Sequence, residues 1–200
     1  MDKVLIVGAT GLLGRALSEA LKGQANLITA SRNGSMETVD MGDALSVEAM
    51  FRRIGPVHHI LSVAGEAPFK PFDQITSADW AHGTGSKMMG QINLTQLGWH
   101  NILPGGSITL TSGILSTYPM AGSSVITTIN SAVEGFVRAA SFELSGKVRV
   151  NAVSPGWISE TLQAMGMNTD AGLPVAEVAK VYVEVLKSDE TGQIKIAAKH

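Results

Sequence analysis

The sequence contains no cysteine, little net charge and no cluster of metal-binding residues, and each shortage excludes a class of protein. Without cysteine, the 200-residue chain has neither disulfides nor thiolate metal sites. A formal net charge of −2 indicates no basic surface, so we expect neither nucleic acid nor an anionic membrane as a partner. The five histidines show no metal-ligand spacing with a carboxylate, and we predict no metal site.

Long apolar runs are also missing. Val4–Val7, Ile60–Ala64 and Ile108–Leu110 have the length of strands, far below the roughly 20 residues that span a bilayer. Because a strand follows Met1 almost directly, we predict no signal peptide and expect a soluble, cytoplasmic protein. With 44% hydrophobic residues and no proline- or serine-rich linker, the chain is predicted to form one domain over residues 1–200.

Short β-rich runs alternate with longer helical stretches along the chain. The expected strands are Lys3–Val7, Asn26–Ala30, Thr38–Asp40, Val57–Val63, Ser107–Thr111, Val148–Val153 and Gln193–Ile196. The expected helices are Leu12–Lys22, Ser46–Arg53, Ser77–Asn101, Ser123–Leu144 and Val175–Lys187. The central strands are apolar at nearly every position, which is typical of a parallel sheet covered on both faces. We therefore predict an α/β Rossmann-type fold, a doubly wound parallel sheet of about seven strands with helices on both faces.

Three glycines stand between the first strand and the first helix. Gly8, Gly11 and Gly14 have Gly-x-x-Gly-x-x-Gly spacing, which allows a tight turn and a close approach of the backbone to a pyrophosphate. The helix N-terminus behind them presents unpaired N–H groups to an anion. The predicted phosphate-binding residues are Gly8, Thr10, Gly11, Leu12 and Leu13. The alternative is a tight turn that binds no ligand.

The second strand ends at Ser31-Arg32, where sites selective for NAD carry an acidic residue that binds the ribose 2′-hydroxyl. A guanidinium suits a 2′-phosphate instead, with Ser31 as a further hydrogen-bond donor. Ser31 and Arg32 therefore favour NADP(H) over NAD(H). The alternative is a solvated surface arginine.

Several further segments carry a resemblance to a known family. They are Gly8-Ala9-Thr10-Gly11-x-x-Gly14, Val39-Asp40-Met41-Gly42-Asp43, Ser62-Val63-Ala64-Gly65, Gly106–Ser112, Val150-Asn151-Ala152-Val153-Ser154-Pro155-Gly156 and Thr191-Gly192-Gln193. In this order the segments resemble those of the short-chain dehydrogenase/reductase family over nearly the whole chain.

The resemblance implies where a nicotinamide cofactor lies. Asp40, followed by Met41, is implied to hold the adenine amino group, and Ala64-Gly65 retains part of the family's Asn-Asn-Ala-Gly. Pro155-Gly156 is implied to pack on the nicotinamide. We add the next two residues, Trp157 and Ile158, to this end of the site, although Trp157 serves equally well in packing alone.

The family's catalytic residues are missing. Its mechanism uses a tyrosine acid and a lysine one helical turn later, but the resemblance places Ile126 and Asn130 at these positions. The usual serine position falls on Gly113, one residue after Ser112, and the supporting asparagine falls on Lys87. The family's ordinary mechanism therefore cannot be carried over.

Lysine and asparagine are exchanged between two adjacent helices in this alignment. Our hypothesis is that Lys87 reaches the site from the opposite side and, if desolvated, donates a proton. Ser112 would then orient a carbonyl, with Thr127 or a water as a relay. The alternative places Lys87 on a solvated helix face, and a loop tyrosine, Tyr118, is a further candidate donor.

Three functions stay open at this point. The first is an NADP(H)-dependent oxidoreductase that acts on a small carbonyl or alcohol substrate through a non-standard set of residues. The second is a non-catalytic NADP(H)-binding sensor or regulatory protein, and the third is a Rossmann-fold interaction module that has lost its cofactor. A homodimer or homotetramer is expected through the helices Ser77–Asn101 and Ser123–Leu144.

Overall fold

The computed structural model describes residues 1–199, and in them seven parallel strands form one sheet in the order β3-β2-β1-β4-β5-β6-β7. The strands are β1 (Lys3–Val7), β2 (Asn26–Ser31), β3 (Glu37–Thr38), β4 (Val57–Ser62), β5 (Ile102–Thr111), β6 (Arg149–Pro155) and β7 (Ile194–Ala197). The order reverses at β1, with β2 on one side and β4 on the other. A ligand is expected beyond the carboxyl ends of these strands, at this reversal.

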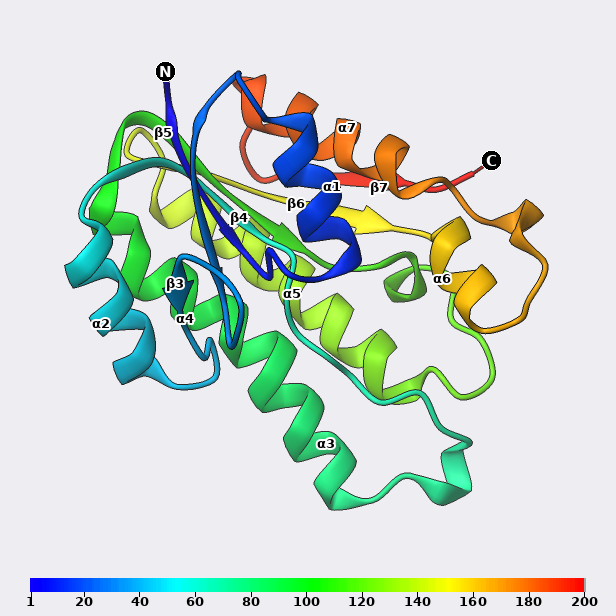
Figure 1. Cartoon of the computed structure of the whole chain (residues 1–200). Coiled ribbons are helices and arrows are strands. Elements are labelled where there is room, and N and C mark those ends of the chain that lie inside the picture. Colours follow the sequence, from blue (N-terminus) through cyan, green and yellow to red (C-terminus); the bar gives the residue numbers. More distant parts are fainter. Residues whose placement is uncertain (200) are drawn as a thin grey trace.

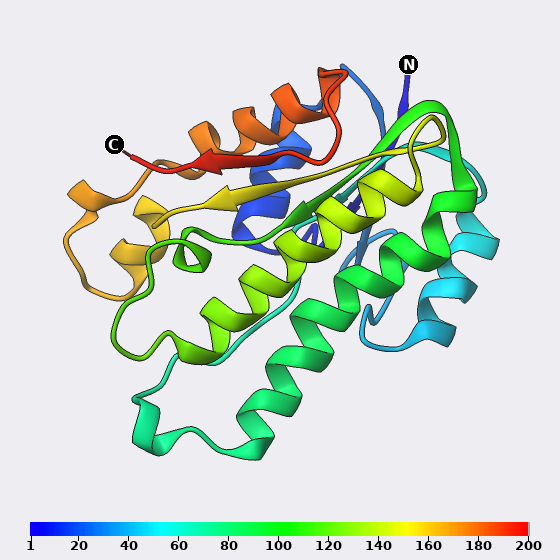
Figure 2. The same cartoon turned by 180° about the vertical axis from the view of Figure 1, so that it is seen from behind.

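Helices cover both faces of the sheet, as Figures 1 and 2 show from opposite sides. They are α1 (Leu12–Ala20), α2 (Ala44–Ile54), α3 (Ser77–Gly83), α4 (Gly90–Gly98), α5 (Ser124–Glu143), α6 (Ser159–Ala164) and α7 (Val175–Lys187). The pair α1 and α7 packs on one face, where Leu17 and Tyr182 are fully buried. The helices α2, α4 and α5 cover the other face, with Met50, Leu94 and Val133 in its core. The doubly wound Rossmann-type fold predicted from the strand and helix pattern is confirmed.

The long helix expected at Ser77–Asn101 is irregular in the middle. A π-helical segment, Thr84–Met89, joins α3 to α4, and a short 3₁₀ turn, Trp99–Asn101, ends the run. A π-helical turn contains one more residue than an α-helical turn, so it changes the direction in which nearby side chains point. Lys87 lies in this segment and is buried.

Besides this helix and small shifts of other ends, such as β3 at Glu37–Thr38 instead of Thr38–Asp40, two elements differ from the sequence prediction. β5 begins at Ile102 rather than Ser107, because Gly105 and Gly106 continue the strand instead of ending it. A Cβ on Gly106 would lie 2.1 Å from the His58 carbonyl oxygen, so only glycine allows β5 to approach β4 here. The short helix α6 was not expected from the sequence.

Candidate functional site

The glycine turn after β1 is built by close backbone contacts. Gly8 has φ = +93° and its N–H donates to the Ala30 carbonyl at 2.8 Å, which ties the turn to the end of β2. A Cβ on Gly14 would lie 2.2 Å from the Gly8 carbonyl oxygen, so this glycine lets α1 pack directly on the turn. α1 begins after Gly11, and no side chain caps its first turn. The N–H groups of that turn therefore face the space beyond β1 without an internal side-chain acceptor.

A cavity of about 790 Å³ lies beside this turn, at the carboxyl ends of β1, β2 and β4. Nine of the cofactor residues predicted from the sequence line it: Gly8, Thr10, Gly11, Ser31, Arg32, Asp40, Met41, Ala64 and Gly65. Its volume falls within the range of cofactor sites, roughly 300–1,000 Å³. Leu12 and Leu13 lie on α1 and are not among the lining residues, and Leu13 packs in the core beneath α1 and α7.

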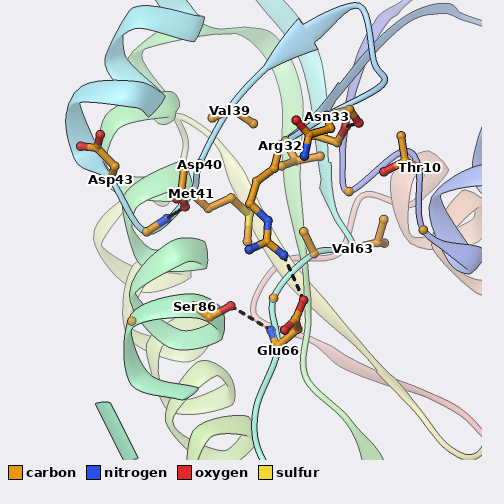
Figure 3. A pocket seen from close by; sticks show the side chains of 18 of the residues that line it. Thr10, Arg32, Asn33, Val39, Asp40, Met41, Asp43, Val63, Glu66 and Ser86 are labelled. Atoms are coloured by element: carbon orange, nitrogen blue, oxygen red, sulfur yellow. Dashed lines mark hydrogen bonds and ion pairs between the residues drawn. The ribbon is translucent and has the colours of Figure 1, made fainter. Parts of the chain in front are cut away.

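Arg32 and Glu66 meet across this cavity. The Arg32 Nη2 atom lies 3.0 Å from Glu66 Oε1, and both side chains line the cavity and are largely exposed (Figure 3). The buried Ser31 hydroxyl instead donates to the Asn33 carbonyl at 2.5 Å, within its own loop. Arg32 is therefore an exposed side chain at the cavity wall, and its binding of a 2′-phosphate stays a prediction.

The segment Val39–Asp43, predicted to bind the adenine, is held by one internal hydrogen bond and by one from α4. The Asp40 carboxylate accepts from the Gly42 N–H at 2.9 Å, and the Met41 carbonyl accepts from the Asn93 side-chain amide at 2.9 Å. Figure 3 shows Asp40 and Met41 on the cavity wall opposite Thr10. The segment thus forms one side of the cavity, and Asn93 on α4 fixes its position.

Lys87 lies between β5 and α5. Its Nζ donates to the Asn130 side-chain oxygen at 2.7 Å and to the Ser112 carbonyl at 2.9 Å. The side chain is 8% exposed, which contradicts the alternative of a lysine on a solvated helix face. Burial lowers the Lys87 pKa from 10.5 to about 8, because the ammonium is desolvated. The structure thus brings together Lys87, Ser112 and Asn130, three residues that the sequence analysis singled out.

Gly65, which lines the cavity, packs closely against the backbone of Lys87. It has φ = +111°, and a Cβ on it would lie 2.8 Å from the Lys87 Cα. On the other side, a Cβ on Gly113 would lie 2.7 Å from the Asn130 side-chain nitrogen. Glycine at both positions therefore leaves room for the lysine–asparagine contact.

A buried carboxylate, Glu134, was missed by the sequence analysis. Its Oε1 accepts from the Ser112 hydroxyl at 3.0 Å and from the Ser116 hydroxyl at 2.6 Å. Glu134 follows Asn130 by one helical turn, so its spacing on the helix could have placed it on the same face. Because the Ser112 proton is donated to Glu134, Ser112 must rotate before it can donate to a substrate carbonyl.

Thr127 belongs to a different set of contacts. Its hydroxyl donates to the Leu115 carbonyl at 2.9 Å and lies 3.0 Å from the Ser123 hydroxyl. It therefore ties the start of α5 to the loop after β5, and its place as a relay to Lys87 stays a prediction.

A family model described as enoyl-(acyl carrier protein) reductase matches residues 8–195. The chain belongs to the short-chain dehydrogenase/reductase family. Members of this oxidoreductase family use a nicotinamide cofactor and act on small molecules.

Solved structures and curated relatives agree with this assignment. The chain is 33% identical to lin1944, a Listeria innocua protein, with a TM-score of 0.93 and with 98% of this chain and 99% of that chain covered. It is 26% identical to a small-chain dehydrogenase solved in complex with NADPH, with a TM-score of 0.88 and coverage of 98% and 96%. It is also 25% identical to the acetoacetyl-CoA reductase of Allochromatium vinosum over 163 residues, 74% of this chain and 66% of that enzyme. The match thus spans just under two thirds of that reductase.

The resemblance places Ile126, and not a tyrosine, at the position of the family's catalytic acid, and this assignment stays a prediction. Ile126 is half-buried on α5. Tyr118 is 65% exposed on the loop after β5. The buried Tyr182 hydroxyl lies 2.6 Å from the Thr111 hydroxyl, and burial raises the Tyr182 pKa well above its ordinary value. The Lys87 ammonium, in contrast, donates to the Ser112 carbonyl.

The segment predicted at the nicotinamide end follows β6. The Gly156 N–H donates to the Ala197 carbonyl at 2.9 Å, and the Trp157 carbonyl accepts from the Leu173 N–H at 2.8 Å. Ile158 pairs with Leu173 in an isolated bridge. Pro155, Gly156, Trp157 and Ile158 are half-buried and do not line the cavity described above. Their role toward the nicotinamide stays a prediction.

Two kinds of feature are absent from residues 1–199. They contain no group of three or more histidine and acidic side chains arranged to hold a metal ion. No helix in this part of the chain has the length and apolar character needed to cross a membrane.

Proposed function

We propose that this chain is an NADP(H)-dependent oxidoreductase that interconverts a small carbonyl compound and its alcohol, with Lys87 as the proton donor. Family membership supports the reaction class, and the NADPH complex of a relative supports the cofactor. The observation that carries the proposal is the buried Lys87 ammonium, which donates to the Ser112 carbonyl and to the Asn130 side chain.

The cavity wall carries residues suited to the adenine, 2′-phosphate and pyrophosphate parts of a dinucleotide. In the proposal, the Gly8–Gly11 turn and the first N–H groups of α1 bind the pyrophosphate, because glycine leaves the backbone open to it. Asp40 binds the adenine amino group, and Arg32 binds the 2′-phosphate. When bound, the nicotinamide supplies or accepts a hydride.

Lys87 would supply the proton that the substrate oxygen needs. Two of the three ammonium hydrogens are used in the bonds to Ser112 and Asn130, which leaves one for a substrate. With a pKa of about 8, Lys87 is mostly charged at pH 7 and releases a proton more readily than an exposed lysine does. In the reducing direction, the carbonyl carbon gains the hydride and the oxygen gains the Lys87 proton.

The first test is a calorimetric titration with NADPH and NADH, followed by assays on a panel of aldehydes and ketones. We expect NADPH to bind more tightly, and Arg32→Ala to remove most of this preference. Lys87→Met should reduce kcat by about a hundredfold or more, the usual worth of a general acid, while NADPH affinity changes little. Lys180→Met, at an exposed lysine on α7, is the matched control. Full activity in Lys87→Met would refute the assignment.

A non-catalytic NADP(H)-binding protein is the second candidate. Ile126 in place of the catalytic tyrosine favours it, since a sensor needs no acid. NADPH binding without turnover of any carbonyl in the panel would select this function.

A further inference from the structure

Two oppositely charged side chains face each other across the cofactor cavity. Arg32 follows β2 and Glu66 follows β4, and their Nη2 and Oε1 atoms are 3.0 Å apart. In Figure 3, the Arg32 side chain crosses the pocket to reach Glu66, between Asp40 and Met41 on one side and Val63 on the other. The guanidinium assigned to a 2′-phosphate therefore already has an anionic partner.

Glu66 is held in this position by contacts with Ser86 and His82. Its backbone N–H donates to the Ser86 hydroxyl at 3.0 Å, which fixes the loop after β4 to the π-helical segment. The His82 Nε2 atom lies 3.6 Å from Glu66 Oε2, the carboxylate oxygen other than the one that Arg32 contacts. Ser86 and His82 also line the cavity, so the carboxylate is part of its wall.

A carboxylate and a phosphate compete for the same donors. The guanidinium binds either of them through its planar fork of N–H groups. A 2′-phosphate at Arg32 would also lie close to the Glu66 charge, and two anions repel each other. The exchange is feasible because both side chains are about two thirds exposed, and exposed ion pairs are weak.

We propose that Glu66 is a specificity-determining residue that weakens the binding of NADP(H) by competing with the 2′-phosphate for Arg32. NAD(H) carries a hydroxyl at this position and meets no such competition. Glu66 therefore reduces the difference between the affinities for NADP(H) and NAD(H). This inference rests on the proposed function, in which Arg32 binds the 2′-phosphate.

The change Glu66→Gln tests the competition. Glutamine keeps the size of the side chain and the backbone bond to Ser86, but it removes the charge. We expect the Kd for NADPH to fall about three- to tenfold, since the weak ion pair and the repulsion disappear together. The Kd for NADH should change less than twofold.

The titration needs four proteins besides the wild type: Glu66→Gln, Arg32→Ala, the double variant, and Glu177→Gln as a control. Glu177 forms an exposed ion pair with Lys180 at 2.6 Å, on a helix that does not line the cavity. Glu177→Gln should bind both cofactors like the wild type. In the Arg32→Ala background, the gain from Glu66→Gln should shrink to less than twofold.

The outcomes separate this inference from the proposed function. If Arg32→Ala weakens NADPH binding while Glu66→Gln leaves it unchanged or weaker, the competition is refuted and the cofactor assignment stands. If the wild type does not bind NADPH, or Arg32→Ala has no effect, both are refuted. A gain of similar size for NADH would also overturn a role in selectivity.

Discussion

The buried ammonium of Lys87 should make the stability of this protein depend on pH in a specific alkaline range. Its pKa is 10.5 in an unfolded chain and about 8 in the folded protein. Below pH 8 both states hold the proton, so Lys87 contributes no pH dependence there. Between about pH 8 and 10.5 the folded state releases the proton while the unfolded state keeps it, so the free energy of unfolding rises with pH.

The size of this rise follows from the lowered pKa. At about 1.4 kcal/mol for each pKa unit, the difference between 10.5 and about 8 corresponds to roughly 3 kcal/mol. Lys87→Met has no titrating group at this site. The free energy of unfolding of the wild type, minus that of Lys87→Met, should therefore grow by roughly 3 kcal/mol from pH 7.5 to 10.5.

Urea unfolding followed by tryptophan fluorescence at several pH values measures this difference. Other alkaline groups, Tyr182 among them, titrate in both proteins and cancel in the subtraction. Lys180→Met, at a largely exposed side chain, should give a difference that stays flat with pH. A flat difference for Lys87→Met as well would show that Lys87 is not desolvated, and the proton-donor proposal would lose its physical basis.

Two glycine substitutions test close contacts of the fold, and a histidine substitution tests a buried titratable group. Gly65→Ala should lower the free energy of unfolding by more than about 2 kcal/mol and lower kcat, because its Cβ would press on Lys87. Gly23 also has a positive φ but faces open space, so Gly23→Ala should lower the free energy of unfolding by only about 1 kcal/mol. Gly14→Ala should raise the Kd for NADPH at least tenfold in calorimetry, since its Cβ forces α1 away from the glycine turn; unchanged binding would refute that contact. Burial lowers the His59 pKa below 6.5, so protonation opposes folding, and stability should fall as the pH drops below 6.5. Urea unfolding from pH 7 to 5 should show a weaker loss in His59→Gln, but not in a control at the exposed His100.

The fold could be predicted from the sequence because its signals are local. Apolar strands alternate with helices, and the helix predicted at Val175–Lys187 has the same bounds in the structure. The start of β5 could not be predicted, since Gly105 and Gly106 read as a turn and only the approach of His58 explains them. Such contacts between distant segments leave no local pattern.

In the candidate site, too, local motifs could be predicted from the sequence and contacts between distant segments could not. The predicted residues of the cavity wall follow β1, β2, β3 and β4, and the glycine spacing, the end of β2 and the family resemblance together were enough to predict them. The ion pair between Arg32 and Glu66 depends on how two loops fold toward each other, and no motif in the sequence indicates it. Glu134 had a detectable helical spacing, but its partner Ser116 lies in a loop whose path only the structure reveals. The oligomer expected through the two long helices stays a prediction.

The direction in which the Lys87 side chain points depends on the number of residues in the π-helical segment. An α-helix turns by about 100° for each residue, and the wide turn at Thr84–Met89 accommodates one residue more than a regular helix would. Deleting a single residue there would restore a regular helix and swing Lys87 away from Asn130, while the flanking turns keep their apolar faces. The chain therefore carries its proposed acid on a π-helical turn, and a regular α-helix over the same residues would point the Lys87 side chain in another direction.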